Sequence, residues 1–336
     1  MKKLGVGVIG LGVGIRHVRS FESHPNCEIV SVCDFLDDKL AKEKEHNPFL
    51  KSTKDANQIL EDPDIDIISV ASFDNYHSSQ IIQAINARKH VMAEKPLCMN
   101  IDEMVQIQAA HMQNIDIKIS ANHVLRTNPR FKRFKTDIAN GKFGDIFYLE
   151  GDYYWGRKHK LFGWRAEMDF YSIILGAAIH MIDLVMWLMN AKPISVQAMG
   201  NDIANINTSL KYNSFAVILL QFENGTIAKL TGNGGSVHPH FHGLKIFGTE
   251  RTAIHTLTEA YNLNTSDINS EPVPITEPYP EKKLREKVIH SFVDSILDPS
   301  ISPLVPHQDV YDVMSVCFAA EKAMNSGKSI SIEYMN

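Results

Sequence analysis

Glu94-Lys95-Pro96 places a carboxylate, an amine and a rigid kink directly after His90–Ala93, an apolar run that predicts a β-strand. In open α/β sheets, ligands bind at the carboxyl ends of the strands. A lysine that is partly withdrawn from water at such a position can change its pKa and move a proton. Lys95 is therefore the first candidate for a catalytic group, against the alternative of an ordinary surface lysine.

A glycine-rich turn, Gly10–Ile15, follows the first predicted strand and opens a predicted helix. Glycines let backbone N–H groups approach a pyrophosphate at a helix amino terminus. The spacing departs from GxGxxG, because Ile15 holds the third glycine position and Gly14 comes one place early. Asp34 ends the second predicted strand, about 20 residues on, where a carboxylate binds the ribose hydroxyls of NAD and repels a 2′-phosphate. The turn and the acid together predict a dinucleotide site that prefers NAD to NADP.

Two ionisable residues interrupt the apolar segment Ile173–Met189: His180 and Asp183. They are three residues apart and so share one face of a helix. Ionisable groups in such a helix cost free energy unless they are paired or used. Two interpretations stay open, a pair satisfied within the core or a polar pair that faces a cleft, with His180 carrying protons near neutral pH.

Three alternating histidines, His238, His240 and His242, would line one face of a strand. Three imidazoles can bind zinc, but no Cys, Asp or Glu lies beside them and Pro239 interrupts the strand, so no metal is expected. A surface loop, or a histidine-rich loop near the substrate, fits better. Ser72–His77 similarly suggests a loop that caps the next helix, with His77 in a structural role.

The elements that position these residues alternate as far as about residue 121. The predicted strands are Leu4–Ile9, Glu28–Cys33, Ile65–Ala71, His90–Ala93 and Ile117–Ala121, and the predicted helices are Val13–Phe21, Leu36–Glu45, Ser78–Ala87 and Ile101–His111. Several of these strands are apolar throughout, which is typical of strands buried on both faces. Asp37, Asn75 and Asn100 lie where helix caps are useful. The alternation predicts a doubly wound parallel sheet.

After Asn122 the predicted strands follow one another. Predicted helices are Phe131–Asn140, Ser172–Met189, Lys283–Leu297 and Gln308–Ser326, and predicted strands are Asp145–Tyr154, Ile194–Met199, Phe215–Phe222, Thr226–Thr231, Leu244–Phe247 and Ala253–Leu257. Turns at Asn224-Gly225 and Gly232–Gly235 favour a mainly antiparallel sheet. We expect an α/β protein with domains at residues 1–121 and 122–336, the second being α+β with a large open sheet.

The composition excludes several protein classes. The 336 residues are 44% hydrophobic and 22% charged with a formal net charge of -5, which gives no reason to expect a nucleic-acid partner. The four cysteines lack paired spacing, so a reduced, cytoplasmic setting is expected. The basic and apolar amino terminus resembles a signal peptide but is better explained as a buried first strand, and Ile173–Met189 is too short to span a membrane.

These motifs, taken together, resemble the glucose–fructose oxidoreductase / inositol dehydrogenase / MocA (GFO/IDH/MocA) family over essentially the whole chain. The matching stretches are Val6–Gly14, Val32–Asp34, Ser69–His77, Glu94–Leu97, Asn122–Arg126, Gly141–Ile146, His180–Leu184 and Phe222–Gly225. The order of Glu-Lys-Pro and His-x-x-Asp-Leu is the specific part of the resemblance, because single glycine motifs are common.

The resemblance implies an N-terminal Rossmann domain and a second α/β domain, with NAD or NADP between them. It implies a cis Lys95–Pro96 bond that aims Lys95 at the reacting hydroxyl, with His180 as its acid/base partner. It also implies that Asp183, Tyr153, Trp164 and Arg165 bind substrate. The implied cofactor-binding residues are Gly10, Gly12, Val13, Gly14, Ile15, Asp34, Ala71, Ser72, Phe73, Asn75, His77, Glu94, Lys95 and Asn122.

The chain departs from the family's pattern at one residue of the predicted site. Many members of the family carry an aspartate four residues before the histidine, and here that residue is Gly176. The chain would then transfer protons with Lys95 and His180 alone, leave room for a bulkier substrate, or have lost catalysis.

The expected activity is hydride transfer between NAD and a secondary alcohol or ketone of a sugar, a cyclitol or a nucleotide-linked sugar. The alternative is a catalytically silent NAD(P)-binding regulatory or sensor protein of the same fold. A homodimer or homotetramer is expected, since an open sheet face invites burial against a second copy.

Overall fold

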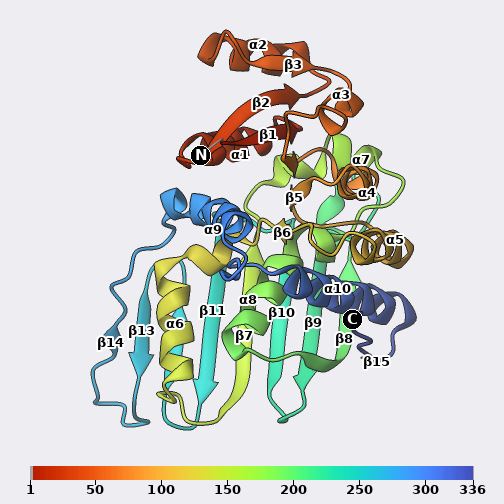
Figure 1. Ribbon diagram of the computed structural model, residues 1–336. Coiled ribbons are helices and arrows are strands. Elements are labelled where there is room, and N and C mark those ends of the chain that lie inside the picture. Colours follow the sequence, from red (N-terminus) through yellow and green to blue (C-terminus); the bar gives the residue numbers. More distant parts are fainter. Residues whose placement is uncertain (1–2, 336) are drawn as a thin grey trace. The chain divides into compact units, whose positions relative to one another are not determined.

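The computed structural model describes residues 3–335, which form two compact units (Figure 1). The first unit runs through Val124 and also takes in Lys283–Tyr311. The second unit comprises Leu125–Lys282 and the chain from Asp312 onward. The chain therefore leaves the first unit, builds most of the second, and returns to the first before it ends in the second.

The returning segment differs from the sequence interpretation, which placed everything after residue 121 in the second domain. Its helix α9 (Glu286–Leu297) packs against α1 (Gly14–Glu22). His290 Nε2 lies 2.9 Å from Ser23 Oγ at this contact. One side of α9 is apolar and buried, so the helix gains more from packing on α1 than from standing alone. No signal in the sequence assigned that apolar side to the earlier domain.

The first unit is built on a parallel sheet in the order β3-β2-β1-β4-β5-β6, which confirms the doubly wound prediction. Its strands are β1 (Leu4–Ile9), β2 (Cys27–Cys33), β3 (Lys51–Thr53), β4 (Ile67–Val70), β5 (His90–Ala93) and β6 (Ile119–Ala121). Its helices include α1, α2 (Asp37–His46), α3 (Ala56–Leu60), α4 (His77–Asn86), α5 (Ile101–Met112) and α9. The central strands β4 and β5 are almost wholly buried, as their unbroken apolar runs require. The short polar strand β3 gave no such signal and was not predicted.

One of the three predicted helix caps is confirmed. Asn100 Oδ1 accepts a backbone N–H at 2.9 Å in the first turn of α5. The predictions for Asp37 and Asn75 are wrong, because Asp37 is already the first helical residue and Asn75 lies within the 3₁₀ turn η1 (Asp74–Tyr76). Near α2, Asp34 Oδ1 accepts the N–H of Leu36 at 3.0 Å instead.

The second unit contains a sheet in the order β14-β13-β12-β11-β7-β10-β9-β8-β15. Among the described strands, β7 and β10 are the one parallel pair, so the prediction of a mainly antiparallel sheet is confirmed. The strands are β7 (Ile146–Tyr154), β8 (Pro193–Asn201), β9 (Phe215–Phe222), β10 (Ile227–Asn233), β11 (Phe241–Gly248), β12 (Thr252–His255), β13 (Ala260–Leu263), β14 (Val273–Pro274) and β15 (Ile330–Ser331). Its helices include α6 (Pro129–Ala139), α7 (Trp164–Glu167), α8 (Ile179–Met189) and most of α10 (His307–Ser326). Figure 1 shows α8 in front of the central strands and α6 in front of the sheet between β13 and β11.

The glycines predicted as turns have two different roles. Gly225, with a φ of +87°, ends the hairpin between β9 and β10 as predicted. Gly232 instead lies within β10, where an added Cβ would be 3.1 Å from the Cβ of Ala178. Gly232 thus permits close packing of the helical segment on the sheet.

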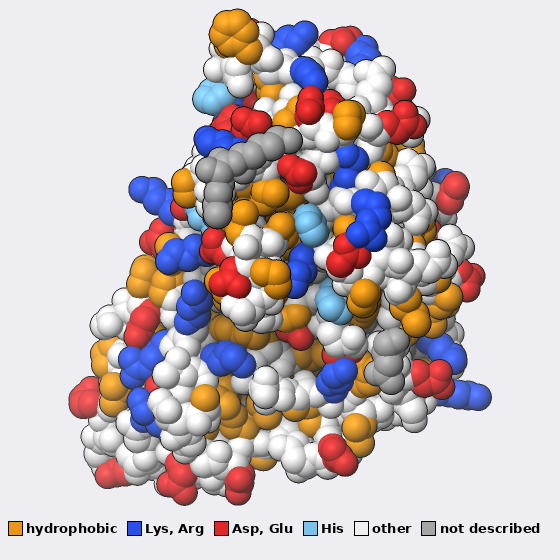
Figure 2. Space-filling view, viewed as in Figure 1, with side chains coloured by type: hydrophobic (Ala, Val, Ile, Leu, Met, Phe, Trp, Pro, Cys, Tyr) orange, Lys and Arg blue, Asp and Glu red, His pale blue; other side chains and the backbone are white. Residues whose placement is uncertain are grey.

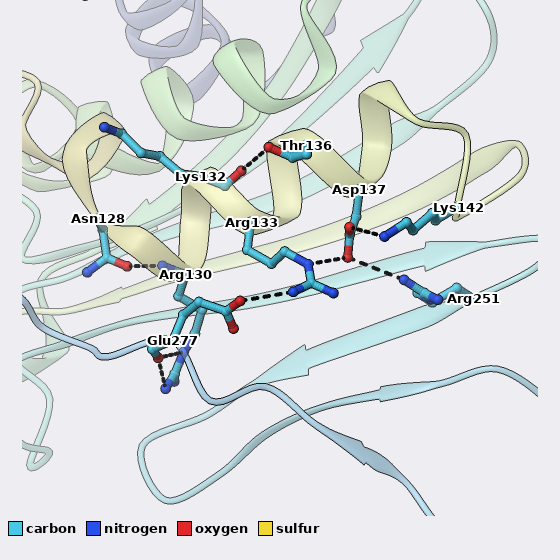
Figure 3. A network of polar contacts seen from close by, with 9 residues as sticks. All are labelled: Asn128, Arg130, Lys132, Arg133, Thr136, Asp137, Lys142, Arg251 and Glu277. Carbon is cyan, nitrogen blue, oxygen red and sulfur yellow. Dashed lines mark hydrogen bonds and ion pairs between the residues drawn. The ribbon is translucent and has the colours of Figure 1, made fainter.

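Helix α6 is fixed by the polar network shown in Figure 3. Asn128 Oδ1 caps it by accepting the N–H of Arg130 at 3.0 Å. At its other end the buried carboxylate of Asp137 accepts hydrogen bonds from Arg133, Lys142 and Arg251. Burial alone would raise the pKa of Asp137, but these hydrogen bonds and charges lower it.

Candidate functional site

Each of the three glycines in the turn after β1 has a different structural role. Gly10 has a φ of +90°, and an added Cβ would lie 2.3 Å from the carbonyl oxygen of Ala71. An added Cβ at Gly14 would lie 2.9 Å from the Cβ of Ala71, so Gly14 lets α1 pack on the sheet. Gly12 is exposed, and its added Cβ would meet no protein atom within 4 Å. The roles of turn, open backbone and close packing are those of a dinucleotide fingerprint, although Gly14 comes one residue early.

Asp34 is linked to this turn. Its Oδ2 accepts the N–H of Leu11 at 2.7 Å and a hydrogen bond from Lys39 Nζ at 3.0 Å. The carboxylate is almost fully buried, with 4% of the residue exposed. Asp34 therefore fixes the backbone of the glycine turn, and its place at the end of β2 is the one expected of a ribose-binding acid.

The loop after β4 is held by His77 rather than exposed to solvent. His77 is fully buried, with Nδ1 2.7 Å from the carbonyl oxygen of Pro96 and Nε2 3.2 Å from that of Ser72. It thus joins the loop after β4 to the loop after β5, which supports the structural interpretation of this histidine. Phe73 is half-buried and Asn75 exposed on the same loop.

Lys95 follows β5 at the same edge of the sheet and is half-buried, and the Lys95–Pro96 bond is cis as expected. The preceding carboxylate has protein partners: Glu94 Oε1 lies 2.9 Å from His17 Nε2 and 2.7 Å from Asn122 Nδ2. His17 Nδ1 in turn lies 2.8 Å from Ser69 Oγ. The buried chain of contacts therefore joins β4, α1, β5 and the residue after β6.

The pKa of Glu94 reflects these partners. Burial alone would raise the pKa of this carboxyl, but the hydrogen bond and charge of His17, the hydrogen bond of Asn122 and the charge of Lys95 outweigh burial and lower it to about 2. Glu94 is thus ionised at neutral pH and occupied by donors from its own unit. The contact between Glu94 and a cofactor that the resemblance implies stays a prediction.

The predicted cofactor-binding residues lie at one edge of the first sheet. They follow the carboxyl ends of β1, β2, β4, β5 and β6, where open α/β sheets bind ligands. Gly12 offers open backbone at the start of α1, and Asn122 Oδ1 is a buried acceptor without a hydrogen-bond partner among the described residues. These features fit a bound dinucleotide.

A second group of predicted residues surrounds His180 in the other unit. The Tyr153 ring on β7 lies 5.3 Å from the half-buried His180 ring and stacks on His242 at 4.5 Å. His240 lies 5.4 Å from Tyr153 and 5.1 Å from His242. Tyr153, His180, His240 and His242 form what we call the imidazole cluster.

The third histidine of the alternating set is elsewhere. His238 stacks on Tyr154 at 4.2 Å, and Tyr154 points to the opposite face of β7 from Tyr153. The expectation that all three histidines line one face is wrong, because β11 begins only at Phe241. Within residues 3–335, no group of three or more His, Cys, Asp or Glu side chains is arranged to hold a metal ion.

A series of contacts links the imidazole cluster to Arg130 on α6. His242 Nδ1 lies 2.7 Å from the hydroxyl of Tyr279, whose ring packs 4.6 Å from His255. His255 Nδ1 accepts a hydrogen bond from Arg130 at 2.9 Å. Burial and the charge of Arg130 lower the pKa of His255 to about 3, so this imidazole is neutral.

Asp183 has a buried protein partner. Its carboxylate, with 1% of the residue exposed, accepts hydrogen bonds from Arg126 Nε at 3.0 Å and Nη2 at 2.6 Å. Arg126 is 2% exposed, so the two charges compensate each other in the core. This geometry supports the interpretation of Asp183 as a satisfied buried residue, and direct substrate binding by Asp183 stays a prediction.

Trp164 and Arg165 are the first two residues of the short helix α7. The Arg165 guanidinium lies over the Trp164 ring at 4.0 Å and 5.6 Å from the ring of Trp155, the residue that follows β7. His240 Nδ1 lies 3.1 Å from the Trp155 carbonyl, which connects this group to the imidazole cluster. Arg165 Nε is a buried donor that no acceptor in residues 3–335 satisfies, a feature that suits a ligand contact.

Sequence reasoning missed His17, Ser69 and the supporting role of Arg126. His17 has a signal in retrospect, since it lies on the buried side of α1 with Gly14, Val18 and Phe21 at helical spacing. Ser69 and Arg126 lie within stretches that match the family, but their contacts could not be predicted because their partners are distant in the sequence.

Two family models match this chain. A model described as an oxidoreductase family with an NAD-binding Rossmann fold matches residues 4–122, and a GFO/IDH/MocA C-terminal domain model matches residues 131–254. The first unit is therefore an NAD-binding domain.

Similar proteins span the whole chain. An uncharacterized oxidoreductase, YrbE, of Bacillus subtilis is 26% identical over 99% of this chain and 98% of its own. Myo-inositol 2-dehydrogenase of Thermotoga maritima is 24% identical over 98% of each chain. The structure of scyllo-inositol dehydrogenase from Lactobacillus casei, with bound NAD(H) and scyllo-inositol, shares the fold with a TM-score of 0.81 at 21% identity, over 98% of this chain and 99% of its own.

Proposed function

The chain belongs to the GFO/IDH/MocA family of oxidoreductases, and we propose that it is an NAD-dependent dehydrogenase of a sugar or cyclitol. The observation that carries this proposal is the open backbone at Gly12, placed at the same sheet edge as Asp34 and Lys95. The relatives that oxidise inositols support the choice of a hydroxyl-rich substrate.

Oxidation of a secondary alcohol breaks one C–H and one O–H bond. The nicotinamide supplies the hydride acceptor when it is bound, and the hydroxyl proton passes to a protein group. We assign this proton to Lys95 and His180. Glu94 is a poor proton acceptor because its lowered pKa makes it a weak base. Its hydrogen bonds with His17 and Asn122 already stabilise the ionised carboxylate. In the reverse direction the same groups return the proton to the carbonyl oxygen.

The substrate assignment rests on the imidazole cluster and the Trp164–Arg165 pair. Hydroxyl and ring N–H groups of Tyr153 and His240 suit the many hydroxyls of a sugar or cyclitol. Aromatic rings such as Trp155 and Trp164 suit its apolar C–H faces. A nucleotide-linked sugar is the alternative substrate. Turnover measured with a panel of free sugars and a panel of nucleotide-linked sugars decides between the two substrate classes.

The test combines NAD titration with turnover of both panels. Lys95→Ala should lose on the order of 10²-fold or more in turnover while NAD binding is largely kept. Lys42→Ala, on the exposed side of α2, is the matched control and should change neither. Unchanged turnover in Lys95→Ala would remove Lys95 from its role. NAD binding by the intact protein without turnover of any panel member would favour the silent sensor.

We also propose a homodimer or homotetramer formed through the open face of the second sheet. Ile227, Tyr148 and Phe247 are directly opposed on three adjacent strands, on the face turned away from α8. Ile227 is 45% exposed and nearby Leu219 is 42% exposed. Ile227→Lys should lower the mass measured by light scattering, whereas Ile268→Lys, at a residue already 96% exposed, should not.

A cytoplasmic location fits the four cysteines, which are buried and form no disulfide within residues 3–335. No helix in the described part of the chain is long and apolar enough to cross a membrane. Charges of both signs are interspersed over the face shown in Figure 2, which favours a small-molecule substrate over nucleic acid.

A further inference from the structure

A segment rich in positive charge follows β7 and leads into α7. Its basic residues are Arg157, Lys158, Lys160 and Arg165. The acids that come next in the sequence, Glu167 and Asp169, are exposed to solvent. The acid that precedes the segment, Asp152, is already engaged in an ion pair with Lys229. The segment therefore has a local excess of positive charge.

A glycine places this segment directly against the histidine-rich loop. Gly156 has a φ of +57°, and an added Cβ would lie 2.4 Å from the His238 carbonyl oxygen and 2.4 Å from the His240 nitrogen. His240 Nδ1 lies 3.1 Å from the Trp155 carbonyl oxygen, and its ring lies 5.4 Å from that of Tyr153. The start of the basic segment is thus in contact with the imidazole cluster.

Two of the four cations converge on one buried indole. Trp155 is 2% exposed, and its ring centroid lies 5.2 Å from Lys160 Nζ and 5.6 Å from Arg165 Cζ. Both distances are within the range of a cation–π interaction. Two like charges near one buried ring also repel each other, because little water screens them there. An anion bound beside Lys160 and Arg165 would offset this repulsion.

The Arg165 guanidinium is fixed in place with an unused donor. Its Cζ lies 4.0 Å from the centroid of the Trp164 ring, so the guanidinium stacks on this indole. A stacked guanidinium keeps its N–H groups in its own plane, where two of them can bind one carboxylate or phosphate. Arg165 Nε is buried and has no hydrogen-bond partner within residues 3–335. A buried donor of a charged group is costly when it is unsatisfied, which indicates that a ligand supplies the acceptor.

We propose that the substrate carries an anionic group, a carboxylate or a phosphate, which Arg165 binds with two hydrogen bonds and Lys160 attracts. The inference rests on the proposed function, because it assigns a charge to the sugar or cyclitol that this protein would oxidise. Hydroxyl oxygens of a neutral polyol can accept hydrogen bonds, but they bring no charge to offset the two cations. The imidazole cluster then contacts the substrate hydroxyls, and the two cations select the substrate by its charge.

Matched substrates separate charge from the rest of the molecule. One pair is D-glucuronate with D-glucose, and the other is myo-inositol phosphate with myo-inositol, each assayed with NAD. In the intact protein, kcat/KM for the anionic member of at least one pair should exceed that of its neutral partner by about tenfold or more. A preference in the first pair identifies the group as a carboxylate, and a preference in the second identifies it as a phosphate. Equal kcat/KM within each pair that is turned over would overturn the proposal.

Substitution of the cations tests whether they recognise the charge. Arg165→Gln should raise KM for the preferred anionic substrate about tenfold or more and leave KM for its neutral partner within about twofold. Lys160→Gln should act in the same direction but less strongly, because an ammonium group lacks the planar fork of a guanidinium. Lys158→Gln removes an exposed cation from the same segment, so it is the matched control and should leave the ratio of the two KM values unchanged. An equal loss for both substrates in Arg165→Gln would show that Arg165 acts by packing alone.

A binding measurement without NAD keeps this inference distinct from the proposed function. Trp155 and Trp164 are two of the three tryptophans of the chain and both contact Arg165, so an anion bound there should change the intrinsic fluorescence. D-glucuronate or myo-inositol phosphate should produce a saturable change that sodium chloride of equal ionic strength does not produce. The change should be lost in Arg165→Gln and kept in Lys158→Gln. If the intact protein oxidises no panel member, the proposed function fails, whereas the absence of a saturable change with both anions overturns the inference independently.

Discussion

Glu94 Oε1 accepts a hydrogen bond from His17 Nε2 at 2.9 Å, which ties the residue before Lys95 to the helix that begins at the glycine turn. On the other side of the ring, His17 Nδ1 lies 2.8 Å from the Ser69 hydroxyl. The same carboxylate oxygen accepts from Asn122 Nδ2 at 2.7 Å. The residue before Lys95 is therefore held by α1, which begins at the glycine turn, and by the residue that follows β6.

The first prediction concerns acid stability. The folded-state pKa of Glu94 is about 2, below its ordinary value of 4.5, so its stabilisation is complete above pH 4.5 and is lost as pH falls toward 2. The shift corresponds to ~3 kcal/mol. In Glu94→Gln, most of the decrease in unfolding free energy between pH 7 and pH 3.5 should disappear, as measured by urea unfolding at the two pH values. Glu45→Gln, at an exposed site, should behave like the wild type, and an identical pH slope in Glu94→Gln would contradict the assignment.

The second prediction compares two glycines of one turn. Gly12→Ala should leave the unfolding free energy within about 0.5 kcal/mol, because its Cβ meets no protein atom within 4 Å. It should weaken NAD binding at least about tenfold, since the methyl group occupies the approach of the pyrophosphate. Gly14→Ala should instead destabilise the fold by about 1–3 kcal/mol, because its Cβ would lie 2.9 Å from that of Ala71. Calorimetry with NAD and thermal unfolding separate the two effects; NAD affinity unchanged in Gly12→Ala would refute the site.

The third prediction concerns the choice between NAD and NADP. Asp34→Ser removes the carboxylate that repels a 2′-phosphate and also releases Lys39, whose Nζ lies 3.0 Å from Asp34 Oδ2. We expect the ratio of NAD to NADP affinity to fall on the order of tenfold, or about 1.4 kcal/mol. Asp34→Ser/Lys39→Ala should recover part of that ratio, because the freed cation is then absent. A wild-type preference for NADP would contradict the role of Asp34.

The sequence predicted the first sheet closely because its strands have one requirement, burial on both faces, which produces unbroken apolar runs. The bounds of β1 and β5 agree with prediction. Edge strands such as β3 and β15 lack that requirement and were missed. The return of α9 to the first unit was missed for another reason, since an apolar helix side does not identify its partner.

The site was predictable where a residue acts through its own chain position and unpredictable where it acts through a distant partner. Gly10, Asp34 and Lys95 directly follow strands, so their place at the sheet edge was predictable from the sequence, and their roles stay predictions. The partners of Glu94 and Asp183 required the fold, because sequence spacing contains no information about contacts across 77 or 57 residues.

The fourth prediction separates a structural from a substrate-binding Asp183. Asp183→Asn removes one charge of the buried, hydrogen-bonded pair that Asp183 forms with Arg126, which should cost about 3–5 kcal/mol of unfolding free energy. The double variant Arg126→Met/Asp183→Leu should recover most of that loss, because neither buried charge remains. Denaturant unfolding of the set gives the coupling directly. A raised KM in Asp183→Asn with unchanged stability would instead favour direct substrate binding.

The last prediction follows from the neutral His255 behind the imidazole cluster. Its folded-state pKa of about 3 lies below the ordinary value of 6.5, so protonation favours the unfolded chain. Stability is therefore full above pH 6.5 and falls by up to about 1.4 kcal/mol for each pH unit below it, until about pH 3.

His255→Asn keeps an acceptor for Arg130 but cannot be protonated, so its unfolding free energy should fall less than that of the wild type between pH 7 and pH 5.5. His159→Asn, at an exposed position, is the control and should keep the wild-type slope. Equal slopes in His255→Asn and the wild type would show that His255 is not held neutral by its burial and by Arg130.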